Sequence, residues 1–157
     1  DGKDRLFSSQ LAANTLARYD IPTGEARLYE MPGSNVGPRR MAIGRDGKIW
    51  IPEYNTGRVT SFDPETEAFD TIDLGVGTAG IYDAAVNGKT GELWLTGSLD
   101  TSLWHVDPET KATARIPLPT EPALSRHMAV DPASGDVWVA YSSLPSAKVE
   151  VARLERR

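Results

Sequence analysis

Three tryptophans at a constant spacing constrain the fold of this chain more than any other feature. Each ends the pattern glycine, any residue, aliphatic residue, tryptophan, and Trp50, Trp94 and Trp138 are separated by 44 and 44 residues. A period of about 40 to 45 residues that contains several short apolar segments is typical of the four-stranded blades of a β-propeller. Helical repeats would show an apolar period of about 3.6 residues instead. We therefore predict an all-β repeat protein with these three side chains in its core.

Turn signals and apolar segments keep the same register. The sequence Asp-Pro-Glu-Thr occurs at residues 63–66 and again at 107–110, which is ordinary turn chemistry because proline fixes φ and aspartate accepts backbone hydrogen bonds. Apolar trios at 41–43, 84–86 and 128–130 begin the expected inner strands. Residues 11–17 are good helix formers. They lack a sustained helical stripe, however, and the repeat places them on a hairpin.

The repeat divides residues 1–157 into parts of a single partial propeller of four-stranded blades. We expect part of a blade at 1–35, whole blades at 36–78 and 79–121, and part of a blade at 122–157. In the first whole blade the strands are expected near 40–44, 48–53, 58–62 and 68–74. The first part lacks its inner strand and the last lacks its outer strand, so about three and a half blades and roughly fourteen strands are present. Unpaired edges invite association, so we expect further blades from the same parent chain, or a second copy, as partners.

Composition argues against two classes of partner. The net charge of −5 offers no basic field for nucleic acid. No apolar stretch approaches the roughly 20 residues of a membrane-spanning helix. The first residues lack the apolar region of a signal peptide, and the chain contains no cysteine. We expect a soluble protein with no nucleic-acid or membrane partner, in the cytoplasm or in the periplasm or extracellular space.

Four segments resemble the streptogramin B lyases (virginiamycin B lyase) and their relatives: residues 37–43, 46–53, 57–64 and 118–120. The resemblance covers nearly the whole chain and implies a seven-bladed propeller. Characterised lyases of this family open a cyclic depsipeptide by elimination, breaking a C–O bond. They use Mg²⁺, a histidine base and a glutamate near the central channel. The resemblance therefore implies a lyase reaction and a Mg²⁺ cofactor.

The positions of the family's two catalytic residues are only partly retained. The histidine position holds Arg39, Tyr82 and Arg126 in successive blades, and the glutamate position holds Glu53, Gly97 and Tyr141. A guanidinium stays charged and cannot act as a neutral base. His127 is adjacent to the position, but alternation along a strand would turn it to the opposite face. The candidates are Glu53 and His127 for catalysis, and Glu53 and Asp83 for a metal.

Charged and aromatic residues flank the starts of the predicted inner strands, which converge at one mouth of the channel. The candidate ligand-binding residues are Arg39, Arg40, Tyr82, Asp83, Arg126 and Tyr141. Arginines could clamp a carboxylate or phosphate while tyrosines stack on it. A salt-bridge network lining a wet channel would use the same residues.

Three functions fit this sequence. The first is a lyase-like propeller that binds a small polar or anionic ligand, with or without C–O lyase activity. The second is a non-catalytic scaffold or sensor that binds a protein or peptide. The third is a metal-dependent, lactonase-like hydrolase.

Overall fold

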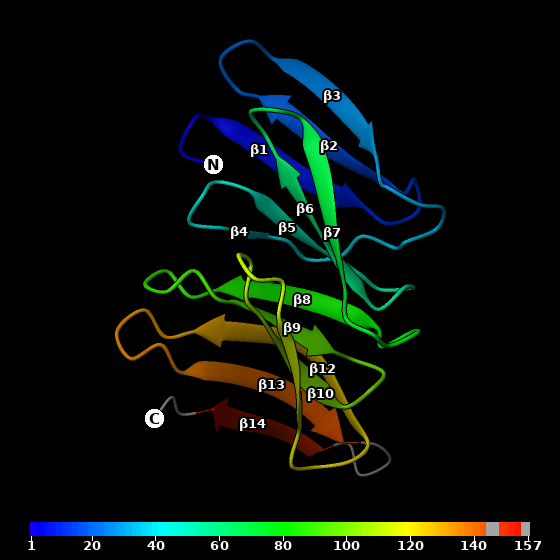
Figure 1. Ribbon diagram of the computed structural model, residues 1–157, viewed down its shortest axis with the longest axis vertical. Helices are drawn as coiled ribbons and strands as arrows, with labels where there is room; N and C mark the ends of the chain where they lie inside the picture. Colours follow the sequence, from blue (N-terminus) through cyan, green and yellow to red (C-terminus); the bar gives the residue numbers. More distant parts are fainter. Residues whose placement is uncertain (144–147, 155–157) are drawn as a thin grey trace.

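The computed structural model describes residues 1–143 and 148–154, and every regular element in this part of the chain is a β-strand. The strands form four antiparallel sheets that follow one another along the chain and lie side by side (Figure 1). Across the same residues there is no helix with the length and apolarity needed to cross a bilayer. The predicted fold, an all-β partial propeller, is confirmed.

The sheets contain three, four, four and three strands. The first has β1 (Arg5–Gln10), β2 (Thr15–Asp20) and β3 (Glu25–Glu30), and the second has β4 (Ala42–Ile43), β5 (Ile49–Glu53), β6 (Arg58–Asp63) and β7 (Ala68–Asp73). The third has β8 (Ile81–Val86), β9 (Leu93–Gly97), β10 (Ser102–Val106) and β11 (Thr113–Pro117), and the fourth has β12 (Ala123–Val130), β13 (Val137–Ser143) and β14 (Lys148–Leu154). Strands adjacent in sequence pair within each sheet, so the chain meanders outward through every sheet.

The inner strand β4 is shorter than predicted because Arg40, just before it, bonds to the next sheet and not to β5. The backbone N–H of Arg39 donates to Pro52 O at 2.9 Å. The N–H of Arg40 donates to Tyr82 O of the next sheet at 3.2 Å. This backbone bond links two sheets where their inner strands begin. It therefore fixes the start of β8 beside the two arginines.

An apolar core separates each pair of neighbouring sheets. Trp50 belongs to one apolar core with Leu93, Leu95 and Val106 of the third sheet and is 4% exposed. Trp94 occupies the equivalent core between the third and fourth sheets and is also 4% exposed. Because each core joins two sheets, no blade has a core of its own.

The third repeated tryptophan differs from the prediction. Trp138 is 41% exposed, although it holds the same place in its sheet. In the described residues no sheet follows β12–β14, so nothing covers the indole as the third sheet covers Trp50.

Left-handed backbone recurs in the turn between the second and third strand positions of the repeat. Asn14, Gly57 and Thr101 have φ values of 57°, 64° and 53° at spacings of 43 and 44 residues. The first of these turns occupies residues 11–14, where helix propensity alone would have predicted a helix and the repeat predicted a hairpin. Turn geometry set by the repeat therefore overrides local propensity here.

Gly57 lies where its turn packs closely on a neighbouring segment of the chain. A Cβ at this position would lie 2.3 Å from the carbonyl oxygens of Val76 and Gly77. Gly75 also has positive φ (73°), but a Cβ there would meet nothing within 4 Å. We expect Gly75→Ala to cost about 1–2 kcal/mol for its backbone alone. Gly57→Ala should cost at least about 1 kcal/mol more. Urea unfolding measures both, and equal losses would contradict the predicted clash.

Candidate functional site

Two β-bulges interrupt the inner strands β8 and β12. In β8 the pairing register shifts between Ile81 and Ala84, so Tyr82 and Asp83 lie opposite the single residue Thr96. The Thr96 hydroxyl lies 3.0 Å from the backbone N of Asp83 and accepts its hydrogen bond. A bulge bends a strand and re-aims its side chains, so Tyr82 and Asp83 depart from simple alternation along β8.

The second bulge changes what was expected of His127. The register of β12 shifts between Ser125 and His127, which leaves Arg126 outside the ladder. Simple alternation would have turned Arg126 and His127 to opposite faces. Instead the Arg126 guanidinium lies 5.8 Å from the ring centre of Tyr82, and His127 Nδ1 lies 2.8 Å from Asp83 Oδ2. Both side chains therefore reach the same bulge of β8.

Five residues from three sheets form what we call the arginine–tyrosine cluster: Arg39, Arg40, Tyr54, Tyr82 and Arg126. The Arg39 guanidinium lies 4.7 Å from the ring centre of Tyr54 and 4.9 Å from that of Tyr82. Arg40 lies 6.0 Å from the Tyr82 ring. The two rings meet edge to face, with centres 6.0 Å apart and an interplanar angle of 81°. Cation–π attraction of about 0.5–2 kcal/mol per pair holds the guanidinium groups at this ring.

The three guanidinium groups have no carboxylate partner among the described residues. The Nε of Arg39 is buried and has no hydrogen-bond acceptor within the same residues. A buried donor without an acceptor is rare in folded proteins. Three like charges around one aromatic ring also repel one another. An anion would relieve this repulsion.

Asp83 joins two sheets beneath this cluster. The carboxyl is 5% exposed, and its Oδ2 accepts a hydrogen bond from Met128 N at 3.0 Å. The same oxygen contacts His127, whose side chain is 68% exposed. Oδ1 accepts from Ala84 N at 3.1 Å. Asp83 therefore holds β12 against β8 and orients an exposed imidazole.

Glu53 is held inside its own hairpin. It is completely buried, and its carboxylate accepts hydrogen bonds from Thr56 Oγ1 at 2.6 Å, Arg58 Nε at 2.9 Å and Thr60 Oγ1 at 2.5 Å. A buried carboxylate with an ion-pair partner and two hydroxyl donors is fully solvated by the protein. Its carboxylate is therefore partnered within the hairpin, and Glu53 is not among the residues of the cluster.

Tyr141 is the ligand-binding candidate that contributes least. It is 5% exposed and packs in the core between the third and fourth sheets with Met128 and Val139. Its edge reaches a hollow of about 330 Å³ that Arg126 and His127 also line. Tyr141 thus supports the wall of the hollow.

The candidate metal ligands do not fit Mg²⁺. Both Glu53 and Asp83 already accept hydrogen bonds on each carboxylate oxygen. Within residues 1–143 and 148–154 no three histidine or acidic side chains gather into a group that could hold a metal ion. Hard cations need several oxygen ligands that are free to point at the ion. We therefore derive no metal chemistry from these residues.

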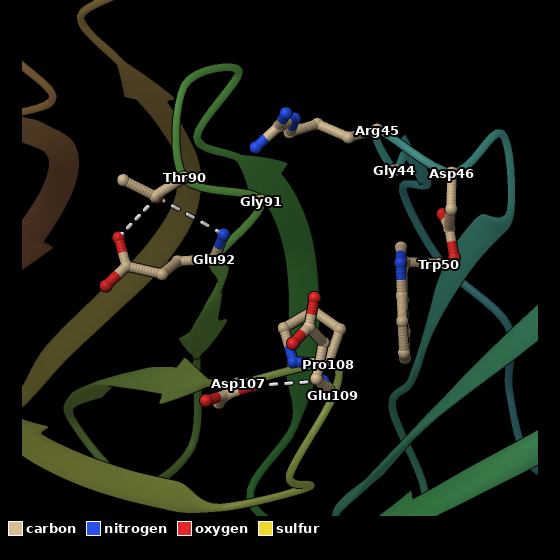
Figure 2. Close-up of a pocket in the computed structure, with 10 residues that line it drawn as sticks. All are labelled: Gly44, Arg45, Asp46, Trp50, Thr90, Gly91, Glu92, Asp107, Pro108 and Glu109. Carbon is tan, nitrogen blue, oxygen red and sulfur yellow. Dashed lines mark hydrogen bonds between the residues drawn. The ribbon is translucent and has the colours of Figure 1, made fainter.

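A larger pocket lies at the turns between the second and third sheets, away from the arginine–tyrosine cluster (Figure 2). It measures about 450 Å³ and is lined by Gly44, Arg45, Asp46, Trp50, Thr90, Gly91, Glu92, Asp107, Pro108 and Glu109. Asp46 and Asp107 accept backbone hydrogen bonds within their own turns. The backbone N–H of Thr110, followed by that of Glu109, holds the pKa of Asp107 below its ordinary value. The predicted turn role of Asp-Pro-Glu-Thr is confirmed, and the pocket shows no group aimed at a ligand.

Four functional or supporting residues were not predicted from the sequence: Tyr54, Thr56, Arg58 and Thr60. Tyr54 directly follows the glutamate position of the repeat, so its place near Arg39 was accessible to the same reasoning. Arg58 pairs directly across the hairpin from Glu53. That pairing follows from the hairpin register, which would have identified the glutamate as structural.

Asp83 is expected to contribute more to stability than the histidine it contacts. Asp83→Ala would leave the buried N–H of Met128 without its acceptor, at a cost of about 1–3 kcal/mol. His127→Ala removes an exposed partner and should cost less than about 1 kcal/mol. Thermal or urea unfolding of the two variants makes the comparison. An equal or larger loss in His127→Ala would show that the histidine, and not the backbone contact, clamps the sheets.

Comparison with known proteins supports the fold and leaves the reaction open. No family model matches the chain. Regucalcin from Sus scrofa is 40% identical over 52 residues, which is 31% of this chain and 17% of that protein. Hydrazine synthase of Kuenenia stuttgartiensis superposes with a TM-score of 0.82 at 14% identity, covering 97% of this chain and 43% of that one.

Virginiamycin B lyase from Staphylococcus aureus superposes with a TM-score of 0.80 at 15% identity. The match covers 94% of this chain but only 51% of the lyase chain, so the present chain spans about half of that structure. Identity this low shows the fold alone, and similar folds carry different functions. The chain has the fold of a streptogramin lyase-like β-propeller.

Proposed function

We propose that this protein binds a small anionic ligand at the arginine–tyrosine cluster, at the mouth of the propeller channel. One observation carries the proposal: three guanidinium groups surround Tyr82 without a carboxylate partner in the described chain. Arginine recognises carboxylates and phosphates through paired, charge-assisted hydrogen bonds. The expected ligand therefore carries a carboxylate or a phosphate group.

The surroundings of the cluster favour a ligand over a simple salt-bridge network. Such a network would place acids between the arginines, but the two candidate acids, Asp83 and Glu53, accept hydrogen bonds from other donors. The buried Nε of Arg39 supplies a donor that needs an acceptor. The edge-to-face tyrosine rings form an apolar surface beside the charges. This surface suits a ligand that has an apolar part as well as a charged group.

A second candidate function, elimination at a C–O bond, is favoured by the Asp83–His127 pair. Nδ1–H of a neutral imidazole donating to Asp83 would leave Nε2 free to accept a proton. Arg126 and His127 both reach the bulge of β8, so a substrate anion bound by Arg126 would lie near this base. Arg126 would orient the substrate, and Asp83 would orient the base.

The lactonase-like alternative receives less support. The match to regucalcin covers 52 residues, and the acidic candidates in this chain are already occupied by protein donors. A scaffold that binds a protein or peptide remains the outcome to expect if no small anion binds.

Titration calorimetry with inorganic phosphate and with citrate tests the proposal. We expect binding that weakens as salt is added, because screening reduces charge attraction. Arg126→Ala and Arg39→Ala should each weaken it about tenfold or more, since a charged hydrogen bond contributes about 1.5–3 kcal/mol. Arg115→Ala is the matched control, because Arg115 is exposed and paired with Asp100.

Two results would contradict anion binding: no heat with either probe, or equal weakening by Arg115→Ala. His127→Ala separates the two candidate functions, since it should leave phosphate and citrate binding unchanged. Any elimination activity, measured on a cyclic depsipeptide substrate, should be lost in the same variant. Retained elimination would remove His127 from the reaction.

A further inference from the structure

The fourth sheet presents an apolar face that no neighbouring sheet in the described chain covers, although the Arg153 guanidinium lies 5.5 Å from the ring centre of Trp138. Trp138, Val149 and Val151 are 41%, 80% and 63% exposed. Cross-strand pairing places Ala140 beside Val151 and Ser142 beside Val149. Since residues two apart share a face, these side chains belong with Trp138 to one surface, which we call the back face. Several exposed apolar side chains on one sheet face indicate an interaction surface.

The repeat shows what kind of surface covers a back face. Trp50 and Trp94 hold the position of Trp138 in the preceding sheets, and both are 4% exposed. The side chains that cover Trp50 include Leu93, Leu95 and Val106, which lie on the facing side of the next sheet. In this repeat, a back face is therefore covered by the side of the next sheet that faces it.

The first sheet has an equivalent side, the one that would face a preceding sheet, and its apolar side chains are exposed. Leu6, Tyr19 and Leu28 are 57%, 44% and 64% exposed. Cross-strand pairing places Leu6 beside Tyr19 on one face, and Leu28 joins that face beside Ala17. We call this surface the front face. Phe7 and Tyr29 lie on the opposite side, against Phe62 of the second sheet.

Residues of the front face match residues that already cover a neighbour within the chain. Leu6 and Tyr19 stand 43 residues before Ile49 and Phe62. Those two are 1% and 0% exposed and belong to the core between the first and second sheets. The front face therefore carries apolar side chains at the positions with which a sheet of this repeat contacts its predecessor.

We infer that the front face of one copy of this chain packs on the back face of a second copy, head to tail. The contact repeats the packing already present between consecutive sheets. Two copies of four sheets supply eight, within the range of about 4–8 blades seen in closed propellers. A heterologous contact closes into a ring when its rotation permits, and closure would leave no apolar face open.

Sedimentation velocity of the chain over a range of concentrations tests this inference. We expect an assembly with twice the mass of the chain, and a blue shift of tryptophan emission as Trp138 becomes buried. Trp138→Glu and Leu28→Glu should each weaken association at least tenfold. Leu99→Glu is the control, because Leu99 is 54% exposed on a loop outside both faces. Val151→Glu replaces Trp138→Glu if circular dichroism shows that the first variant is unfolded.

Mixing the two variants distinguishes head-to-tail pairing from other arrangements. A copy with Trp138→Glu keeps its front face, and a copy with Leu28→Glu keeps its back face, so the mixture should regain association through one intact contact. Full association of Leu28→Glu alone would indicate back-to-back pairing and overturn the inference. A wild-type chain that stays monomeric at every concentration would also overturn it, and would assign the back face to a blade of a longer chain or to another protein.

Discussion

The burial of one blade tryptophan by the next sheet is the interaction on which the rest of the structure depends. Each four-stranded sheet is too thin to enclose apolar side chains, so the cores form between sheets. Trp50 and Trp94 belong to two such cores, and their 44-residue spacing reflects this repeated packing. Stability therefore depends on neighbours along the chain, as in other repeat proteins.

The candidate site exists because this packing brings three sheets together at one end. Arg39 and Arg40 precede β4 and Tyr54 follows β5 of the second sheet, Tyr82 lies in the third sheet and Arg126 in the fourth. No single blade contains the cluster. Its geometry depends on the backbone bond between Arg40 and Tyr82 and on the contact of Asp83 with Met128. A change that separates two sheets would therefore disperse the charges as well.

The sequence predicts the architecture well because the repeat supplies several independent observations of the same register. The order of strands, the incomplete end sheets and the hairpin at residues 11–14 all follow from aligning the units. The side-chain directions at the mouth do not, because they depend on bulges in β8 and β12 that alternation cannot foresee. Glu53 shows the same limit: a family position suggested catalysis, while its partners Arg58 and Thr60 hold it in a buried network. The exposure of Trp138 depends on what lies beside the sheet, which local sequence does not specify.

Charge and packing act in opposite directions at the arginine–tyrosine cluster. Apolar cores draw the sheets together, and in doing so they bring three guanidinium groups to one tyrosine ring, where the groups repel one another. Cation–π contacts offset part of this repulsion. They do not supply a hydrogen-bond acceptor for the buried Nε of Arg39. An anion would neutralise the charges. Ligand binding and sheet association would then stabilise each other, because both depend on the same three sheets being held at the same spacing.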